Sequence, residues 1–300
     1  LSIYKVNNSE YIQQGDLQKV KKIAWITDTA ALLTPQFIEQ HNVHVLPLNI
    51  VFEDGAYREI VDLTHKEFYE KLRTTKEHPT TSQPNFGEHV ALYERLKEEG
   101  YDVAIAVHTS AQQSGTATSA PMAAEQAGFK SYVIDSMIGS YPMQKMLEKG
   151  FELEKQGASP EEIVAAIEAM RPQSELAFIP ANLEKLHKSG RVSGMAMFLS
   201  NLLNIKLVIS YDKGVCVVAQ KVRAEKRAKK AIIDLLDKAL AQSVVDEVAV
   251  IHTNNKDGAA EWKKELEASY PNINFVITEL SAVVGALTGE GTLGLSWVRQ

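Results

Sequence analysis

The sequence predicts an α/β protein of two domains, with a Rossmann-like parallel sheet in the first and a less regular α/β arrangement in the second. Its 300 residues suit two domains. In the first half, short apolar runs rich in β-branched residues alternate with helical patterns, which is typical of βαβ units. We expect domains at 23–158 and 159–300 after an N-terminal extension at 1–22, with the chain ends able to cross between domains.

The domain boundary is predicted at 157–160, because Ser159 is a good helix N-cap and Pro160 a good first helical residue. The segment 78–85 contains two prolines and three hydroxyl residues, so we expect an ordered loop there. In the first domain, the patterns predict strands at 23–29, 43–52, 103–107 and 131–135, and helices at 34–40, 63–72, 86–99 and up to about residue 127.

The second half mixes strands and helices less regularly. A turn signal at 212–214 divides 206–221 into a predicted hairpin. The glycine-rich segment 285–294 suits a tight turn or a close approach of the backbone to a ligand. The remaining patterns predict helices at 140–156, 182–188, 224–240 and 259–269, and strands at 176–179, 248–252 and 273–277.

Composition and missing motifs argue against several classes of function. A formal net charge of −6 and an isoelectric point near 5.8 disfavour nucleic-acid binding, which needs a basic surface. No apolar run is long enough to span a bilayer, and residues 1–22 lack the apolar core of a signal peptide. The motifs GxGxxG, GxxxxGK[ST] and HExxH are absent, so we expect neither a nucleotide cofactor nor a metal. The single cysteine, Cys216, fits a reducing, cytoplasmic compartment.

The clearest candidate site lies in the stretch 101–120. The buried strand predicted at 103–107 ends in polar residues, and residues 114–116 open the next helix. In an open α/β sheet this edge faces the ligand crevice, where free N–H groups at a helix start favour an anion. The alternative is that a serine here only caps the helix. The groups that would bind an anionic head are Thr109, Ser110, Ser114, Gly115 and Thr116.

The segment 192–205 is the candidate wall for an apolar ligand tail. It carries no charge over fourteen residues and is too short to span a bilayer. Methionines adapt to flexible ligands, so the segment suits an elongated apolar pocket, although an ordinary core is the simpler alternative. The tail-lining candidates are Met195, Met197, Phe198, Leu199, Leu202 and Leu203.

Two other functions remain open on the residues alone. Ser110 or Ser114, with His108 and Asp135, has the residue types of a catalytic triad, but the GxSxG motif of serine hydrolases is absent. The same hydroxyl-rich turn also suits a sensor that binds a small anion or phosphate above an ordinary core. From the residues alone, the interpretation that we favour is a binding site for a small anionic head group.

Seven short motifs occur along the chain in an order and spacing that are specific as a set. They are ITDT (26–29), VLPLNI (45–50), TTSQPN (80–85), EGYDVAIAVHTSAQQSGT (99–116), VIDS (133–136), LEKLHKSGRVSG (183–194) and KVR (221–223). Over about residues 22–297 the chain resembles the DegV family of bacterial fatty-acid-binding proteins.

This resemblance implies a carrier with two α/β domains and its ligand between them. One long-chain fatty acid would lie in a buried interdomain tunnel, with no other cofactor. A separate ATP-dependent fatty acid kinase would phosphorylate the presented carboxylate. Transferred motif by motif, Thr81, Ser82 and Ser110 become ligands of the head group. Arg191, in the SGR motif, would lie near the head group or near the surface that docks the kinase.

Residues 285–291 depart from the pattern of this family, which usually reads G-x-H-T-G-P-G. Leu287 stands in place of the histidine and Glu290 in place of the proline. The change removes a donor for the carboxylate and is expected to bring a repelling charge near it. Thr288 is the candidate replacement donor. Lipid binding is therefore better supported by the sequence than kinase-dependent phosphorylation.

Overall fold

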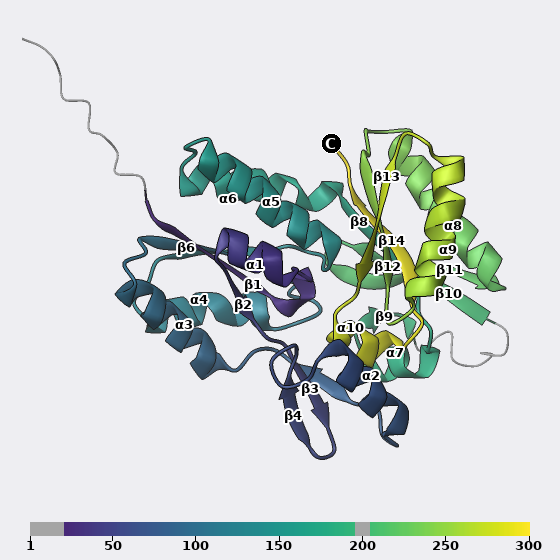
Figure 1. Ribbon diagram of the computed structural model, residues 1–300, viewed down its shortest axis with the longest axis horizontal. Helices are drawn as coiled ribbons and strands as arrows, with labels where there is room; N and C mark the ends of the chain where they lie inside the picture. Colours follow the sequence, from purple (N-terminus) through teal and green to yellow (C-terminus); the bar gives the residue numbers. More distant parts are fainter. Residues whose placement is uncertain (1–20, 196–204) are drawn as a thin grey trace, which may run out of the picture.

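The computed structural model describes residues 21–195 and 205–300, which form three β-sheets with helices around them (Figure 1). The first sheet is parallel, as the sequence predicts, with strand order β2-β1-β6-β7. Every residue of β1 and β6 is buried, as expected for the central strands of a covered parallel sheet. The strands are β1 (Ile23–Asp28), β2 (Val43–Leu46), β6 (Val103–His108) and β7 (Ser131–Asp135).

Helices cover both faces of this sheet. Because successive side chains of a strand alternate, Ala104 and Ala106 of β6 pack with α3 and α4, while Ile105 and Val107 join the core that contains α5. The boundary predicted at 157–160 falls between α5 and α6, and α6 packs against α5 and β7. The helices of this half are η1 (Thr29–Ala31), α1 (Pro35–His41), α3 (Phe86–Glu98), α4 (Thr116–Gln126), α5 (Tyr141–Lys155) and α6 (Pro160–Ala169).

The strand expected at 43–52 is instead two strands in two different sheets. Pro47 interrupts it, because proline has no N–H to donate to a strand ladder. Beyond Pro47 the chain enters a small antiparallel sheet of order β4-β3-β5, and the expected loop at 78–85 supplies its third strand. This sheet and its helix comprise β3 (Asn49–Phe52), β4 (Gly55–Arg58), β5 (Thr80–Ser82) and α2 (His65–Thr74).

The C-terminal half is built on a mixed sheet of order β13-β12-β14-β8-β10-β11-β9. The predicted hairpin is present, and its turn residues Lys213 and Gly214 have positive φ angles of 47° and 87°, as a two-residue hairpin turn requires. The strands are β8 (Ser174–Ile179), β9 (Val192–Ser193), β10 (Ile205–Asp212), β11 (Val215–Arg223), β12 (Glu247–His252), β13 (Asn274–Glu279) and β14 (Leu293–Val298).

The two faces of the C-terminal sheet differ in what covers them. Trp262 of α9 and Ile232 of α8 pack on the outer face (Figure 1). Phe178 and Ile209 on the inner face share one hydrophobic core with Ile105 of the N-terminal sheet. Within the described ranges, no helix has the length and apolar character needed to cross a membrane. The remaining helices are η2 (Arg171–Gln173), α7 (Leu183–Ser189), α8 (Glu225–Leu240), α9 (Lys256–Ser269) and α10 (Ala282–Thr288).

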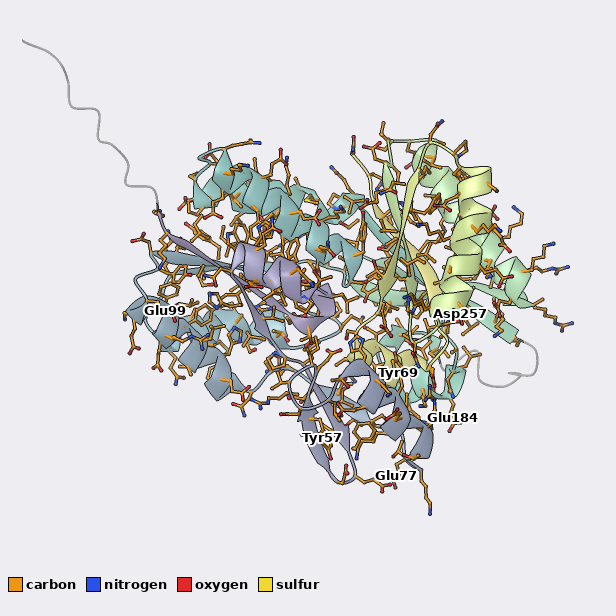
Figure 2. All side chains as sticks on the ribbon, in the orientation of Figure 1. Tyr57, Tyr69, Glu77, Glu99, Glu184 and Asp257 are labelled. Carbon is orange, nitrogen blue, oxygen red and sulfur yellow. The ribbon has the colours of Figure 1, made fainter. Side chains whose placement is uncertain are left out.

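The glycine-rich segment 285–294 is only partly the turn that we expected. Gly289 and Gly291 do form a turn, with φ angles of 88° and 100°. Gly285, however, lies in α10, where an added Cβ would approach the Tyr69 hydroxyl to 2.5 Å; Figure 2 labels this tyrosine on α2. Gly294 lies in β14, where a Cβ would come within 2.4 Å of the Ala177 carbonyl oxygen. These two glycines allow close packing between protein elements.

A buried carboxylate joins the small sheet to both halves of the chain. Glu59, which directly follows β4, is 1% exposed. It accepts hydrogen bonds from the Thr29 hydroxyl (2.5 Å), from the Ala282 backbone N–H (2.5 Å) and from the Ser281 hydroxyl (3.3 Å). The Thr29 oxygen in turn accepts from the Leu48 N–H at 3.1 Å. The hydrogen bonds of Glu59 therefore connect the end of β1 to the start of α10.

His65 lies between two carboxylates at the same junction. Its Nδ1 is 3.5 Å from Glu279 Oε2, and its Nε2 is 3.8 Å from Glu59 Oε1. The hydrogen bond to Glu279 raises the pKa of His65 above its ordinary value, despite partial burial. Burial also raises the pKa of Glu59, while the hydrogen bond from His65 lowers that of Glu279. When it is protonated, His65 thus forms an ion pair between α2 and β13.

We expect Glu59→Ala to lower the free energy of unfolding by on the order of 3 kcal/mol, because it leaves buried donors without an acceptor. Chemical denaturation measures the change. The matched control is Glu53→Ala, which removes an exposed carboxylate from the turn after β3 and should change stability by less than about 0.5 kcal/mol. Equal effects of the two substitutions would contradict the role given to Glu59.

We expect the stabilising effect of His65 to depend on pH. Because its pKa is raised in the folded state, the contribution is complete below the unfolded pKa of about 6.5 and is lost as pH rises through the folded value. The difference in unfolding free energy between wild type and His65→Gln should therefore shrink from pH 6 to pH 9. The same comparison in a Glu279→Gln background should show a weaker pH dependence. A difference that stays constant with pH contradicts the ion-pair account.

Candidate functional site

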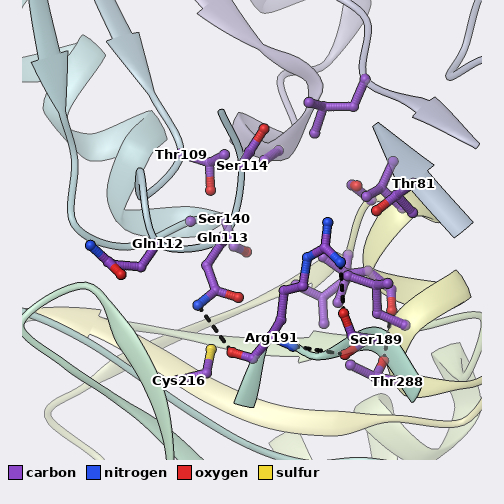
Figure 3. Close-up of a pocket in the computed structure, with 18 of the residues that line it drawn as sticks. Thr81, Thr109, Gln112, Gln113, Ser114, Ser140, Ser189, Arg191, Cys216 and Thr288 are labelled. Carbon is purple, nitrogen blue, oxygen red and sulfur yellow. Dashed lines mark hydrogen bonds between the residues drawn. The ribbon is translucent and has the colours of Figure 1, made fainter. Parts of the chain in front are cut away.

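A cavity of about 640 Å³ lies between the N-terminal and C-terminal sheets (Figure 3). Its wall includes residues that follow β1, β6 and β7, which is the carboxyl edge at which the sequence predicts a ligand site. The small sheet, the C-terminal sheet, α7 and α10 complete it. The volume is within the usual range for small-molecule sites, and the wall has distinct polar and apolar parts.

The polar part is formed by two loops that meet. One is the end of β5 with Thr81, Ser82 and Gln83; the other is the loop from β6 to α4, with Thr109 and residues 111–115. An added Cβ at residue 115 would lie 1.8 Å from Gln83 Oε1, so glycine leaves room for this flexible side chain between the loops. Gly115 is also the N-cap of α4 and has no side chain to cap the first turn, where the Thr116 N–H donates to Ser114 Oγ at 3.4 Å.

The apolar part comes mainly from the C-terminal half. Leu176 and Phe178 point from β8 into the cavity, and α10 contributes Val283, Val284 and Leu287. Cys216 on β11 also lines the cavity, and burial raises the pKa of its thiol to about 12. This wall excludes water from a chain-like ligand without offering it any charge.

Seven of the nine predicted head-group residues line the cavity, and two do not. Ser110 is fully buried: its hydroxyl donates to the Gly214 carbonyl at 2.7 Å and accepts from the Gln112 N–H at 3.2 Å. Thr116 is also buried, with its hydroxyl 2.8 Å from that of Ser114. Both residues support the polar loop without lining the cavity. The lining set is Thr81, Ser82, Thr109, Ser114, Gly115, Arg191 and Thr288.

Arg191 is the one charged side chain in the lining among residues that the structure describes. Its Nη1 donates to the Ser189 carbonyl at 2.6 Å, and its own carbonyl accepts from Gln113 Nε2 at 3.3 Å (Figure 3). The second bond links the loop after β6 to the segment that enters β9. A positive charge is thus held at the cavity wall beside neutral donors, and this combination suits an anionic group.

The departure at residues 285–291 has a clear structural result. Leu287 lines the cavity and extends its apolar part. Glu290 does not line it: its carboxylate accepts from Arg73 Nε at 3.0 Å, and the hydrogen bond from Arg73 lowers its pKa. The repelling charge that we expected near the head group is therefore paired elsewhere. Thr288 lines the cavity but donates its hydroxyl to the Val284 carbonyl at 2.9 Å.

The candidate tail residues are largely outside the described part of the chain. Met197, Phe198, Leu199, Leu202 and Leu203 fall in 196–204, which the structure does not describe. Met195 is described and is buried at 3% exposure, as part of the shared core. Sequence reasoning missed the apolar lining from β8 and α10, since a short buried strand looks the same whether its neighbour is core or ligand.

The triad residue types do not form a catalytic arrangement. His108 Nδ1 lies 3.1 Å from Asp28 Oδ2, and both side chains are fully buried. Asp135 Oδ1 accepts from the N–H groups of Ala111 and Met137, so it shapes the loops. The hydroxyl of Ser110 bonds to a carbonyl, as described above. In the described ranges, no three His, Cys, Asp or Glu residues are grouped as a metal site would need.

Comparison with known proteins identifies close relatives over nearly the whole chain. Residues 22–300 match the family described as "Uncharacterised protein, DegV family". Protein DegV of Bacillus subtilis (strain 168) is 38% identical over 277 residues, which cover 92% of this chain and 98% of that protein.

Two solved structures have the same fold. The crystal structure of DegV from Bacillus subtilis, described as a fatty acid binding protein, has a TM-score of 0.85 at 37% identity and covers 93% of this chain and all 100% of its own. A DegV family protein from Thermus thermophilus, described by its fatty acid binding, has a TM-score of 0.84 at 29% identity with the same coverage. The chain described above belongs to the DegV family.

Proposed function

We propose that this protein is a carrier that binds one long-chain fatty acid in the cavity between its two halves. The carboxylate lies at the polar part, against Thr81, Ser82, the start of α4 and Arg191. The chain runs along the apolar wall from β8 and α10. The observation that carries this proposal is a single cavity with one anion-attracting part and one uncharged apolar part.

The energetics favour a long chain over a small anion. Each buried CH₂ contributes about 0.8 kcal/mol, so the apolar wall supplies more affinity than the head group does. Two relatives above 25% identity, from Bacillus subtilis and Thermus thermophilus, are described as fatty acid binding proteins. A site that binds only a small anion does not require the apolar part of the cavity.

The protein itself supplies binding and orientation, and we assign the chemistry to a partner. An acyl phosphate forms when a carboxylate oxygen attacks the γ-phosphorus of ATP and ADP leaves. We propose that a separate cytoplasmic fatty acid kinase carries out this step on the presented carboxylate, as the resemblance to the DegV family implies. The candidate nucleophile of a hydrolase is not paired with a base, because the Ser110 hydroxyl donates to the Gly214 carbonyl.

Native mass spectrometry of protein purified without added lipid tests the binding proposal. We expect a mass shift that corresponds to one fatty acid per chain, and organic extraction should release that acid for identification. Val284→Trp is the variant that should block binding, because its larger side chain fills the apolar part of the cavity from α10. Its folding is checked by circular dichroism. Folded Val284→Trp should carry much less lipid than wild type.

An empty protein that also fails to bind added oleic acid would contradict the proposal. So would a bound phosphorylated polar ligand, which would favour the anion sensor. Equal lipid loading of wild type and folded Val284→Trp would place the ligand elsewhere in the molecule.

Leu287→His tests how the altered segment affects head-group recognition. A histidine donor in the cavity wall should tighten binding of oleic acid about tenfold relative to oleyl alcohol, because hydrogen bonds to a charged group are the stronger kind. Leu287→Phe is the control, since it adds a ring without a donor. Titration of delipidated protein measures both affinities. If the two variants shift the ratio equally, residue 287 does not reach the carboxylate.

A further inference from the structure

The cavity wall contains a buried hydroxyl group that makes no hydrogen bond to any other described residue. Ser140 is 5% exposed and lines the cavity (Figure 3). Its Oγ is buried and has no hydrogen-bond partner among the described residues. Buried hydroxyl groups in folded proteins nearly always have a partner, so an unpaired one beside a cavity points to a bound group.

Ser140 has a backbone conformation that glycine adopts more easily than serine. Its φ of 64° and ψ of −141° place it in a region that residues with a Cβ rarely enter. The turn holds it there: the Ile138 carbonyl accepts hydrogen bonds from the Ser110 N–H and the Thr109 hydroxyl, and the Ser140 N–H donates to the Ala30 carbonyl at 2.9 Å. The hydroxyl is therefore present although the backbone favours a residue without a side chain.

Ser140 also begins a helix whose first turn is uncapped. It is the N-cap residue of the fifteen-residue α5, yet its side chain makes no cap hydrogen bond. The eleven-residue α4 begins at Gly115 in the same cavity wall, also without a side-chain cap. Two helix N-termini thus meet one cavity, and their dipoles favour the same anionic group. The α5 terminus offers few N–H groups of its own, because residue 142 is proline and the Met143 N–H donates to the Ser140 carbonyl at 2.9 Å.

Several other hydroxyl protons in the cavity wall and the loop behind it already have acceptors. Ser110 donates to the Gly214 carbonyl, Thr109 to the Ile138 carbonyl and Thr288 to the Val284 carbonyl. A hydroxyl has only one proton to donate, so these groups cannot also donate to a ligand. The hydroxyl proton of Ser140 has no acceptor among the described residues.

We propose that Ser140 Oγ donates a hydrogen bond to the carboxylate of the bound fatty acid, at the point where the α4 and α5 N-termini meet the cavity. This inference rests on the proposed function and names a head-group ligand that neither the motifs nor the family pattern assigned. It gives the cavity a donor that does not depend on residue 287.

Two substitutions at Ser140 separate the hydroxyl from the backbone. Ser140→Ala removes the hydroxyl and keeps the unfavourable backbone, while Ser140→Gly removes both. Delipidated proteins are titrated with oleic acid and with oleyl alcohol, which carries no charge. Both variants should bind oleic acid about tenfold more weakly than wild type and oleyl alcohol less than threefold more weakly. Thermal unfolding without ligand should show Ser140→Gly at least as stable as wild type.

Ala224→Gly is the matched control. Ala224 is an exposed N-cap residue of α8 with φ 77° and ψ 142°, and it does not line the cavity. Its replacement should raise the melting temperature in the same way as Ser140→Gly, with no change in either affinity. A gain in stability at both positions with a loss of oleate binding only at Ser140 supports the proposal.

Three outcomes would overturn it. If wild type binds oleic acid and both Ser140 variants match it, the hydroxyl is not a ligand. If the variants lose both ligands equally, Ser140 shapes the wall and does not contact the carboxylate. If wild type binds neither ligand, the proposed function itself fails, and the head-group role fails with it.

Discussion

The buried carboxylate of Glu59 is the interaction on which the cavity wall depends. Helix α10 has only seven residues, too few to be stable alone, and it carries Val283, Val284 and Leu287 of the apolar wall. Its start is held by Glu59 through Ser281 and Ala282. The same carboxylate accepts from Thr29 at the end of β1, so one group positions both sides of the cavity.

The cavity is an opening within a core that the two halves share. Ile105 of the first sheet and Phe178 of the C-terminal sheet belong to one hydrophobic cluster, and Phe178 also faces the cavity. A ligand there completes the packing between the sheets. A ligand that binds only the folded state stabilises that state by mass action. Occupancy of the cavity and the stability of the packing between the two halves are therefore linked.

Sequence reasoning was most successful where local signals agree with the fold. The buried β-branched run at 103–107 and the two-residue turn at 213–214 predicted β6 and the hairpin correctly. It failed where long-range pairing decides the structure: Pro47 sends one apolar run into two sheets, and β5 forms in a proline-rich segment because β3 lies beside it. For the site, residue type predicted loops that line the cavity, but the acceptor of each hydroxyl proton depends on contacts such as Ser110 with Gly214, 104 residues away.

These details separate a binding site from a catalytic one. A hydrolase needs a hydroxyl whose proton passes to a base, whereas the Ser110 proton is held by the backbone carbonyl of Gly214. A carrier needs donors, a positive charge and an apolar wall, all of which meet in one cavity. Under the proposed function, the groups that activate the carboxylate come from a second protein.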